Sequence, residues 1–163
     1  KNLPAMLTAF ARADIPSDFS FFLSGHGDDM LCPLISKLGI KKRVRFLGTI
    51  PEVDLPKLYR GAYATIYVSL MEGFGLPVVE SMASGTPVLT STAGSLPEIA
   101  GGAAVCVDPH DVDAIAGGME TLVKDTNRYR ELQELGVRQS MRFNWDQTAA
   151  KTWEVITDQK RTL

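Results

Sequence analysis

The sequence predicts an α/β fold, a doubly wound parallel sheet with helices on both faces. Short apolar runs alternate with longer segments of helical periodicity along most of the chain, and this alternation is typical of parallel sheets. The 163 residues are enough for one domain and not comfortably for two. Hydrophobic residues make up 45% of the chain and charged residues 22%, the balance of an ordinary globular domain.

Five short apolar runs are predicted as strands. A glycine or a polar residue follows each run, and short runs bounded in this way are typical of strands that are buried on both faces. They cover residues 19–24, 43–47, 64–68, 87–90 and 104–107.

The predicted helices rest on the spacing of apolar residues and on the positions of prolines. In the first of them Met6, Leu7 and Phe10 fall on one stripe. Pro33 and Pro77 fall in the first turns of later helices, where the missing proline N–H is tolerated. The predicted helices cover residues 4–13, 30–38, 54–60, 77–83, 111–124, 127–142 and 146–157.

Two aspartates are predicted to cap helices. Asp54 and Asp111 stand where helical segments begin, and a carboxylate there can accept the N–H groups of the first turn. Asp111 and Asp113 also form an Asp-x-Asp pair, a pattern that elsewhere binds a divalent metal with a nucleotide sugar. Because the pair follows Pro109 and opens a helix, we interpret it as a cap and predict no metal site.

The chain begins with a helical segment at Lys1, Asn2 and Leu3, and no strand precedes it. A doubly wound domain normally begins with a strand, which is central in the commonest strand order. We therefore expect a fragment, or a domain whose first strand lies outside this sequence. The neighbours of that strand would then have unpaired edges in the centre of the sheet.

Charge and composition exclude several classes of function. The net charge is −2, and the basic cluster at residues 41–43 is interpreted as a solvated loop, so we expect no nucleic-acid partner. No apolar run approaches the roughly 18 residues that span a bilayer, and no secretory signal is apparent. Cys32 and Cys106 are too few for a disulfide framework, and Cys106 is predicted to be a packed core thiol. We expect a cytoplasmic protein, with peripheral membrane association left open for the full-length form.

A glycine-rich turn between two carboxylates follows the third predicted strand. Glu72 and Glu80 bracket Gly73 and Gly75, and Pro77 opens the next helix. In an open α/β sheet this turn lies at the carboxyl end of a strand, where ligands bind. Glycines let backbone come close to a ligand, and free N–H groups at a helix start favour anions. Such amides beside two carboxylates that accept hydroxyl groups suit a sugar attached to a diphosphate.

Residues 69–88 closely resemble the retaining glycosyltransferases of family 4. These enzymes have two Rossmann-like domains that face a cleft, the architecture called GT-B. The resemblance extends over nearly all of residues 1–163. It implies the C-terminal half, which is the nucleotide-sugar (donor) binding domain, with strand order 3-2-1-4-5-6, strand 1 missing and the N-terminal acceptor domain absent. Further segments that resemble the family are residues 44–48, 96–101, 107–109 and 143–146.

The resemblance implies a role for each residue of the motif. Glu80 matches the carboxylate that binds the ribose hydroxyls of the donor nucleotide, which suits a group that accepts two hydrogen bonds. Glu72 matches the residue beside the donor sugar. It is the implied catalytic residue, because a carboxylate there can stabilise positive charge near the anomeric carbon. Phe74, Gly75 and Leu76 match the turn whose amides meet the sugar and the phosphates.

Three further positions follow from the resemblance. Lys1 matches the family's phosphate-binding lysine, whose ammonium neutralises the leaving diphosphate, although the arginine that precedes it in the family is absent from this sequence. Thr49 and Ile50 fall where the family turns under the nucleobase. The predicted donor-binding residues are Lys1, Thr49, Ile50, Glu72, Gly73, Phe74, Gly75, Leu76 and Glu80.

The implied function is transfer of a sugar, as a hexosyltransferase, from a UDP-, GDP- or ADP-sugar to an unidentified acceptor with retention at the anomeric carbon. The expected setting is cell-envelope polysaccharide biosynthesis, without a metal or other cofactor. The implied partners are the nucleotide sugar, the acceptor and the missing N-terminal domain, and this fragment alone is expected to bind donor weakly without turnover. Two alternatives stay open: a non-catalytic nucleotide-sugar-binding subunit, and a nucleotide-sugar 2-epimerase, which shares the GT-B architecture.

Overall fold

The computed structural model describes residues 1–27 and 30–157. Its strands are β1 (Phe21–Leu23), β2 (Val44–Phe46), β3 (Thr65–Tyr67), β4 (Val88–Ser91) and β5 (Val105–Val107). They form two parallel sheets, one of β1 and β2 and one in which β4 lies between β3 and β5. The five predicted strands are confirmed to within two residues at each end.

The two sheets match the expected strand order with one strand left out. If β1 to β5 take positions 2 to 6 of that order, β1 and β2 lie on one side of position 1 and the other three strands lie on the other side. No ladder joins the two sheets within the described ranges. One edge of β1 and one edge of β3 therefore have no strand partner among these residues.

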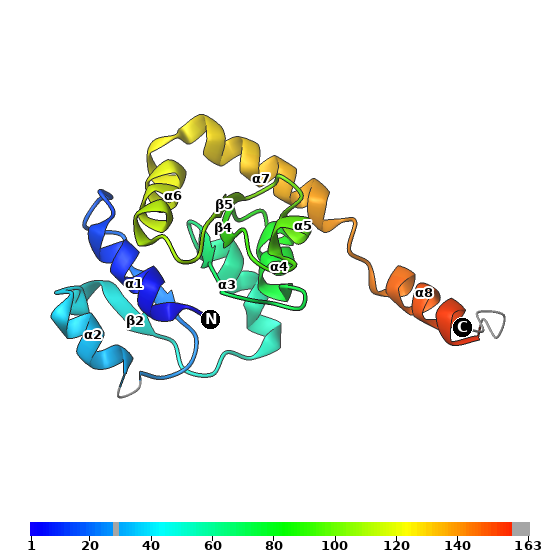
Figure 1. Cartoon of the computed structure of the whole chain (residues 1–163), viewed down its shortest axis with the longest axis horizontal. Helices are drawn as coiled ribbons and strands as arrows, with labels where there is room; N and C mark the ends of the chain where they lie inside the picture. Colours follow the sequence, from blue (N-terminus) through cyan, green and yellow to red (C-terminus); the bar gives the residue numbers. More distant parts are fainter. Residues whose placement is uncertain (28–29, 158–163) are drawn as a thin grey trace.

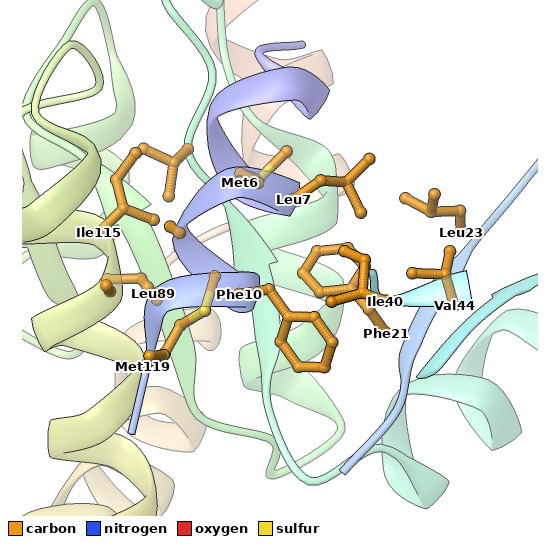
Figure 2. Close-up of a cluster of buried hydrophobic side chains, with 14 of the residues drawn as sticks. Met6, Leu7, Phe10, Phe21, Leu23, Ile40, Val44, Leu89, Ile115 and Met119 are labelled. Carbon is orange, nitrogen blue, oxygen red and sulfur yellow. The ribbon is translucent and has the colours of Figure 1, made fainter. Parts of the chain in front are cut away.

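Helix α1 (Leu3–Arg12) joins the two sheets through its side chains. Met6, Leu7 and Phe10 are buried on one face of the helix, as their spacing predicts. Figure 2 shows these side chains between those of the β1–β2 sheet and those of α6 (Val112–Lys124). Other buried members of the same cluster are Phe21, Leu23, Val44, Leu89, Ile115 and Met119. One hydrophobic cluster therefore extends across both sheets.

The remaining helices complete the described fold. They are α2 (Leu31–Lys37), η1 (Lys41–Arg43), η2 (Glu52–Asp54), α3 (Leu55–Gly61), α4 (Leu76–Ala83), α5 (Leu96–Ala100), α7 (Thr126–Ser140) and α8 (Trp145–Thr157). The predicted helices are confirmed with small shifts at their ends. The short helix α5 was not predicted, because its five residues are too few to show a helical period. It packs with α4 over a second cluster that includes Val78, Met82, Val88, Leu96 and Ile99.

Of the two predicted helix caps, one is wrong and one is confirmed. Asp54 has helical backbone angles (φ −97°, ψ −13°), and its side chain makes no capping hydrogen bond. A capping residue normally has an extended backbone that turns its side chain back onto the helix, and Asp54 instead pairs with Lys57 at 3.1 Å. Asp111 has the extended backbone, and its carboxylate accepts the N–H groups of Asp113 and Ala114.

Two side-chain environments differ from the predictions. Cys106 is exposed rather than packed in the core. The reason is that β5 is an edge strand, in which alternation turns Val105 and Val107 toward the core instead. Arg43, predicted in a solvated loop, is half-buried and donates a hydrogen bond to the Phe19 carbonyl oxygen at 3.1 Å.

Helix α8 extends away from the rest of the described chain (Figure 1). None of its residues is buried, and Trp145 and Trp153 are 77% and 68% exposed. The helix therefore adds little to the core of this fold. In the residues that the structure describes, no helix combines the length and the apolar character needed to cross a bilayer.

Candidate functional site

The glycine-rich turn lies where it was predicted, between the end of β3 and the start of α4. Gly75 directly precedes the helix and has a positive φ of 116°, a conformation that residues with a side chain disfavour. A Cβ on Gly75 would also lie 2.6 Å from Leu96 Cδ2, too close for a non-bonded contact. Gly73 has open space around its Cα and no positive φ, so packing within the chain does not require glycine there.

A serine from a different segment holds the shape of this turn. Ser95 Oγ lies 3.0 Å from the carbonyl oxygen of Glu72 and 2.7 Å from that of Phe74. Gly94 allows this close approach, since a Cβ there would lie 3.0 Å from the Glu72 carbonyl oxygen. Neither residue was predicted from the sequence, because nothing local shows that they lie beside the turn.

Lys1, Tyr67 and Glu72 form one hydrogen-bonded group at the carboxyl end of β3. Lys1 Nζ lies 2.7 Å from Glu72 Oε1 and 2.5 Å from the Tyr67 hydroxyl oxygen. The Tyr67 hydroxyl in turn donates to Glu72 Oε1 at 2.8 Å. The Lys1 side chain is 62% exposed and that of Glu72 18%, so the ammonium stays accessible while the carboxylate is largely enclosed. Tyr67 was not among the predicted site residues.

Asn2 explains how Lys1 reaches this position. Its backbone is left-handed (φ 60°, ψ 29°), a conformation that asparagine tolerates better than most residues. Its side-chain amide donates to the carbonyl oxygens of Val68 at 3.1 Å and Pro109 at 2.7 Å. The start of α1 is thereby tied to the segments that follow β3 and β5, and Lys1 is directed toward Glu72.

The surroundings of Glu72 keep it ionised. Partial burial alone would raise the pKa of Glu72, but hydrogen bonds from Lys1 and Tyr67 and the charge of Lys1 outweigh it and lower the pKa from 4.5 to about 2. The hydrogen bond to Glu72, followed by that to Tyr67, raises the pKa of Lys1. The buried Ser69 hydroxyl has no hydrogen-bond partner of standard geometry among the described residues. The site therefore holds a carboxylate and an ammonium in direct contact.

Glu80 has a hydrogen-bond partner of its own. It lies on α4, and its Oε2 accepts a hydrogen bond from the Tyr59 hydroxyl of α3 at 2.9 Å. The pKa of Tyr59 is raised, chiefly by burial and then by the hydrogen bond to Glu80 and the charge of that carboxylate. Tyr59, like Tyr67, was not among the predicted site residues.

The structure does not bring every predicted residue to the glutamates. Thr49 and Ile50 lie in the loop after β2, the first exposed and the second half-buried. Among residues 1–27 and 30–157, the Thr49 hydroxyl makes no hydrogen bond to either glutamate, and the Ile50 side chain has no group that could make one. Phe74 and Leu76 are 41% and 47% exposed, so the turn presents apolar surface beside the two carboxylates.

Acidic side chains elsewhere do not gather into a metal centre. In the described part of the chain, no group of three or more histidine, cysteine, aspartate or glutamate side chains is placed to hold a metal ion. The two acids of the Asp-x-Asp pair are used otherwise: Asp111 caps α6, and Asp113 accepts a hydrogen bond from Arg12 at 2.8 Å.

Comparison with known proteins agrees with this arrangement. The profile of the glycosyl transferases of group 1 matches residues 1–139. The chain belongs to this family. Among curated relatives, O-antigen chain mannosyltransferase B of Escherichia coli is 35% identical over 158 residues, which cover 93% of this chain and 41% of that protein. MMP alpha-(1->4)-mannosyltransferase of Mycolicibacterium hassiacum is 38% identical over 123 residues, which cover 73% of this chain and 30% of that protein.

Solved structures of glycosyltransferases have the same fold as this group 1 chain. Sucrose-phosphate synthase from Thermosynechococcus elongatus matches with a TM-score of 0.85 and 26% identity, over 96% of this chain and 41% of that one. The predicted α/β fold, a Rossmann-like half of the GT-B architecture, is therefore confirmed. The chain spans about two fifths of the length of the O-antigen relative and of the synthase, at 41% of each.

Proposed function

We propose that this chain is the donor-binding domain of a retaining glycosyltransferase of family 4. The observation that carries the proposal is the contact of Lys1 with Glu72, at 2.7 Å, beside the start of α4. It combines an ammonium, a carboxylate and a helix start, which are the groups that suit a sugar attached to a diphosphate. Membership of the group 1 family supports the same function.

Each predicted residue then has a distinct task. The Lys1 ammonium and the N–H groups at the start of α4 neutralise the diphosphate, and Gly73 leaves room for the ligand beside them. Glu80 accepts hydrogen bonds from the ribose hydroxyls, and the loop at residues 49–50 lies under the nucleobase. Glu72 contacts the donor sugar. Because its pKa is about 2, it acts as an anion that stabilises positive charge at the anomeric carbon and not as a proton donor.

In the proposed reaction the bond between the anomeric carbon and the diphosphate oxygen breaks. The acceptor oxygen bonds to the same face of the sugar, and its proton passes to the leaving phosphate. UDP-, GDP- and ADP-sugars are all candidate donors. Mannose is the first sugar to test, because two relatives named as mannosyltransferases are similar in the part of the chain that would bind the donor. The O-antigen relative makes cell-envelope polysaccharide biosynthesis the proposed setting.

The acceptor would bind to an N-terminal domain outside these residues, since the chain spans 41% of its O-antigen relative. Two features of the fold support such an arrangement. The exposed Trp145 and Trp153 of α8 offer apolar surface for a second domain, and the unpaired edges of β1 and β3 can accept a further strand. On this proposal the chain alone binds donor weakly and does not turn over.

Calorimetric titration with UDP, GDP and ADP, and then with their sugars, tests donor binding. The titration is made on this chain and on the full-length protein, with Glu80→Ala and with Glu134→Ala as a matched control, because Glu134 is exposed on α7. We expect one nucleotide to bind the parent and the control about equally and to bind Glu80→Ala at least about tenfold more weakly. No binding of any nucleotide by the folded full-length protein would overturn the proposal.

Product analysis then separates the enzyme from its alternatives. We expect sugar release by the full-length protein to require an acceptor, and NMR of the product to show the same anomeric configuration as the donor. A change at C2 of the donor sugar without any acceptor would instead identify an epimerase. Donor binding without release for any acceptor tried would favour a non-catalytic subunit.

A further inference from the structure

Tyr59 is the partner that the protein supplies to Glu80. The Tyr59 hydroxyl donates to Glu80 Oε2 at 2.9 Å, from a helix different from the one that carries the glutamate. Tyr59 is half-buried, and burial, followed by the hydrogen bond to Glu80, raises its pKa. The phenol therefore stays neutral near pH 7 and remains a hydrogen-bond donor.

The backbone that carries Tyr59 is itself anchored. Its carbonyl oxygen accepts hydrogen bonds from the buried Thr86 hydroxyl at 2.7 Å and from the Ala62 N–H at 3.0 Å. Helix α3 also packs against α4, which carries Glu80. The backbone of Tyr59 is thus held in place while its phenol contacts the Glu80 carboxylate.

This contact occupies one oxygen of the Glu80 carboxylate, and the other oxygen stays available to a ligand. Within the described residues, Glu80 Oε1 has no protein hydrogen-bond partner. A glutamate side chain loses rotational freedom when it is held in one orientation, and the Tyr59 contact imposes that loss before any ligand binds. Glu80 Oε1 is therefore presented in an orientation that is set in advance, which favours binding of a hydroxyl group.

We propose that Tyr59 is a positioning residue that orients Glu80 toward the ribose and thereby sets a preference for ribonucleotides over 2′-deoxyribonucleotides. The inference rests on the proposed function, because it requires Glu80 to contact the ribose of the donor. A site built to hydrogen-bond a hydroxyl discriminates against the analogue that lacks it, because the acceptor is then left unpaired. That discrimination is lost when the Glu80 carboxylate is free to turn toward water.

The test compares a ribonucleotide with its deoxy form. The nucleoside diphosphate that binds the full-length protein most tightly is titrated against the parent and against Tyr59→Phe, and the titrations are repeated with the 2′-deoxynucleoside diphosphate. Phenylalanine keeps the ring and removes only the hydroxyl. We expect the parent to prefer the ribonucleotide by about tenfold or more. Tyr59→Phe should lose most of that preference through weaker binding of the ribonucleotide, with the affinity for the deoxynucleotide unchanged.

Tyr129→Phe is the matched control. It also removes one phenol hydrogen bond, which Tyr129 on α7 donates to the Tyr63 carbonyl oxygen at 2.8 Å, and it should keep the full preference. A second measurement combines Tyr59→Phe with Glu80→Gln. If Tyr59 acts through Glu80, the losses of ribonucleotide affinity caused by the two changes do not add.

Three results would overturn the inference: an unchanged preference in Tyr59→Phe, equal weakening of both nucleotides, or a parent that does not distinguish them. Failure of the parent to bind any nucleoside diphosphate is a separate outcome, because it removes the proposed function itself. If the parent binds the ribonucleotide and any of the three results is obtained, only the proposed role of Tyr59 is ruled out.

Discussion

Lys1 Nζ lies 2.7 Å from Glu72 Oε1, although 71 positions separate the two residues in the chain. The Tyr67 hydroxyl contacts both groups, and the side chain of Asn2 holds the start of α1 in place. Each charge therefore neutralises the other. On the proposed function, a diphosphate that binds Lys1 would compete with Glu72 for the ammonium, so diphosphate binding would change the electrostatic surroundings of Glu72.

Removing the ammonium should raise the pKa of Glu72. Lys1→Met keeps a long unbranched side chain but deletes the charge and the hydrogen bond that lower this pKa, so we expect it to move up from about 2 toward 4.5. NMR titration of the glutamate side-chain carboxyl carbons measures the change. Lys57→Met is the control, because Lys57 pairs with Asp54 and not with Glu72. An unchanged Glu72 pKa in Lys1→Met would contradict the assigned cause.

Acid should destabilise the fold partly through Glu72. The pKa of Glu72 is about 2 in the folded chain, against an ordinary 4.5, so the unfolded chain binds this proton more readily. The contribution to stability is complete above pH 4.5 and is lost as the pH falls toward 2. Glu72→Gln lacks this contribution. Its urea midpoint should therefore fall less than that of the parent between about pH 6 and about pH 3, and an equal fall in both proteins would count against the prediction.

The two glycines of the turn should respond differently to substitution. Gly75→Ala should lower the free energy of unfolding by about 1–3 kcal/mol, because φ is 116° and the new Cβ would lie 2.6 Å from Leu96 Cδ2. Urea denaturation measures this loss.

Gly73→Ala is the matched substitution in the same turn. It should change the free energy of unfolding by less than about 0.5 kcal/mol, since the added Cβ meets nothing within 4 Å. If Gly73 leaves room for the donor as proposed, the same variant binds donor more weakly than the parent. Equal losses of stability in the two variants would show that the turn is not constrained as described.

Removing α8 should leave the stability of the remaining fold unchanged. Ending the chain after Asn144 deletes a helix with no buried residue, so the free energy of unfolding should change by less than about 0.5 kcal/mol. Urea denaturation checks this, and light scattering should show less self-association, because the exposed Trp145 and Trp153 are gone.

A shorter chain provides the contrast. Ending it before Gln139 also deletes the buried amide that donates to the Ile99 carbonyl oxygen at 3.0 Å, and this variant should be clearly destabilised. A large loss of stability on removal of α8 alone would mean that α8 packs on the rest of the chain.

The elements predicted correctly are those whose signals are local. The apolar stripe of α1, the cap at Asp111 and the glycine before α4 depend on residues a few positions apart, so the sequence is enough to locate them. Glu72 and Glu80 were predicted as site residues from an equally local signal, one short segment at the end of a strand, and their roles stay a prediction. Helix α5 was missed because its five residues give no period.

The partners of the two glutamates follow from three-dimensional packing instead. Tyr59 is predicted only as an ordinary helix residue, and only the packing of α3 against α4 shows that its hydroxyl meets Glu80. Tyr67 is predicted only as part of an apolar run, and the path of the turn after β3 brings Glu72 to its hydroxyl. The outward position of Cys106 likewise depends on β5 being at an edge of its sheet. A hydrogen bond between two elements requires a spatial approach of a few ångströms, and separation along the chain carries no information about that approach.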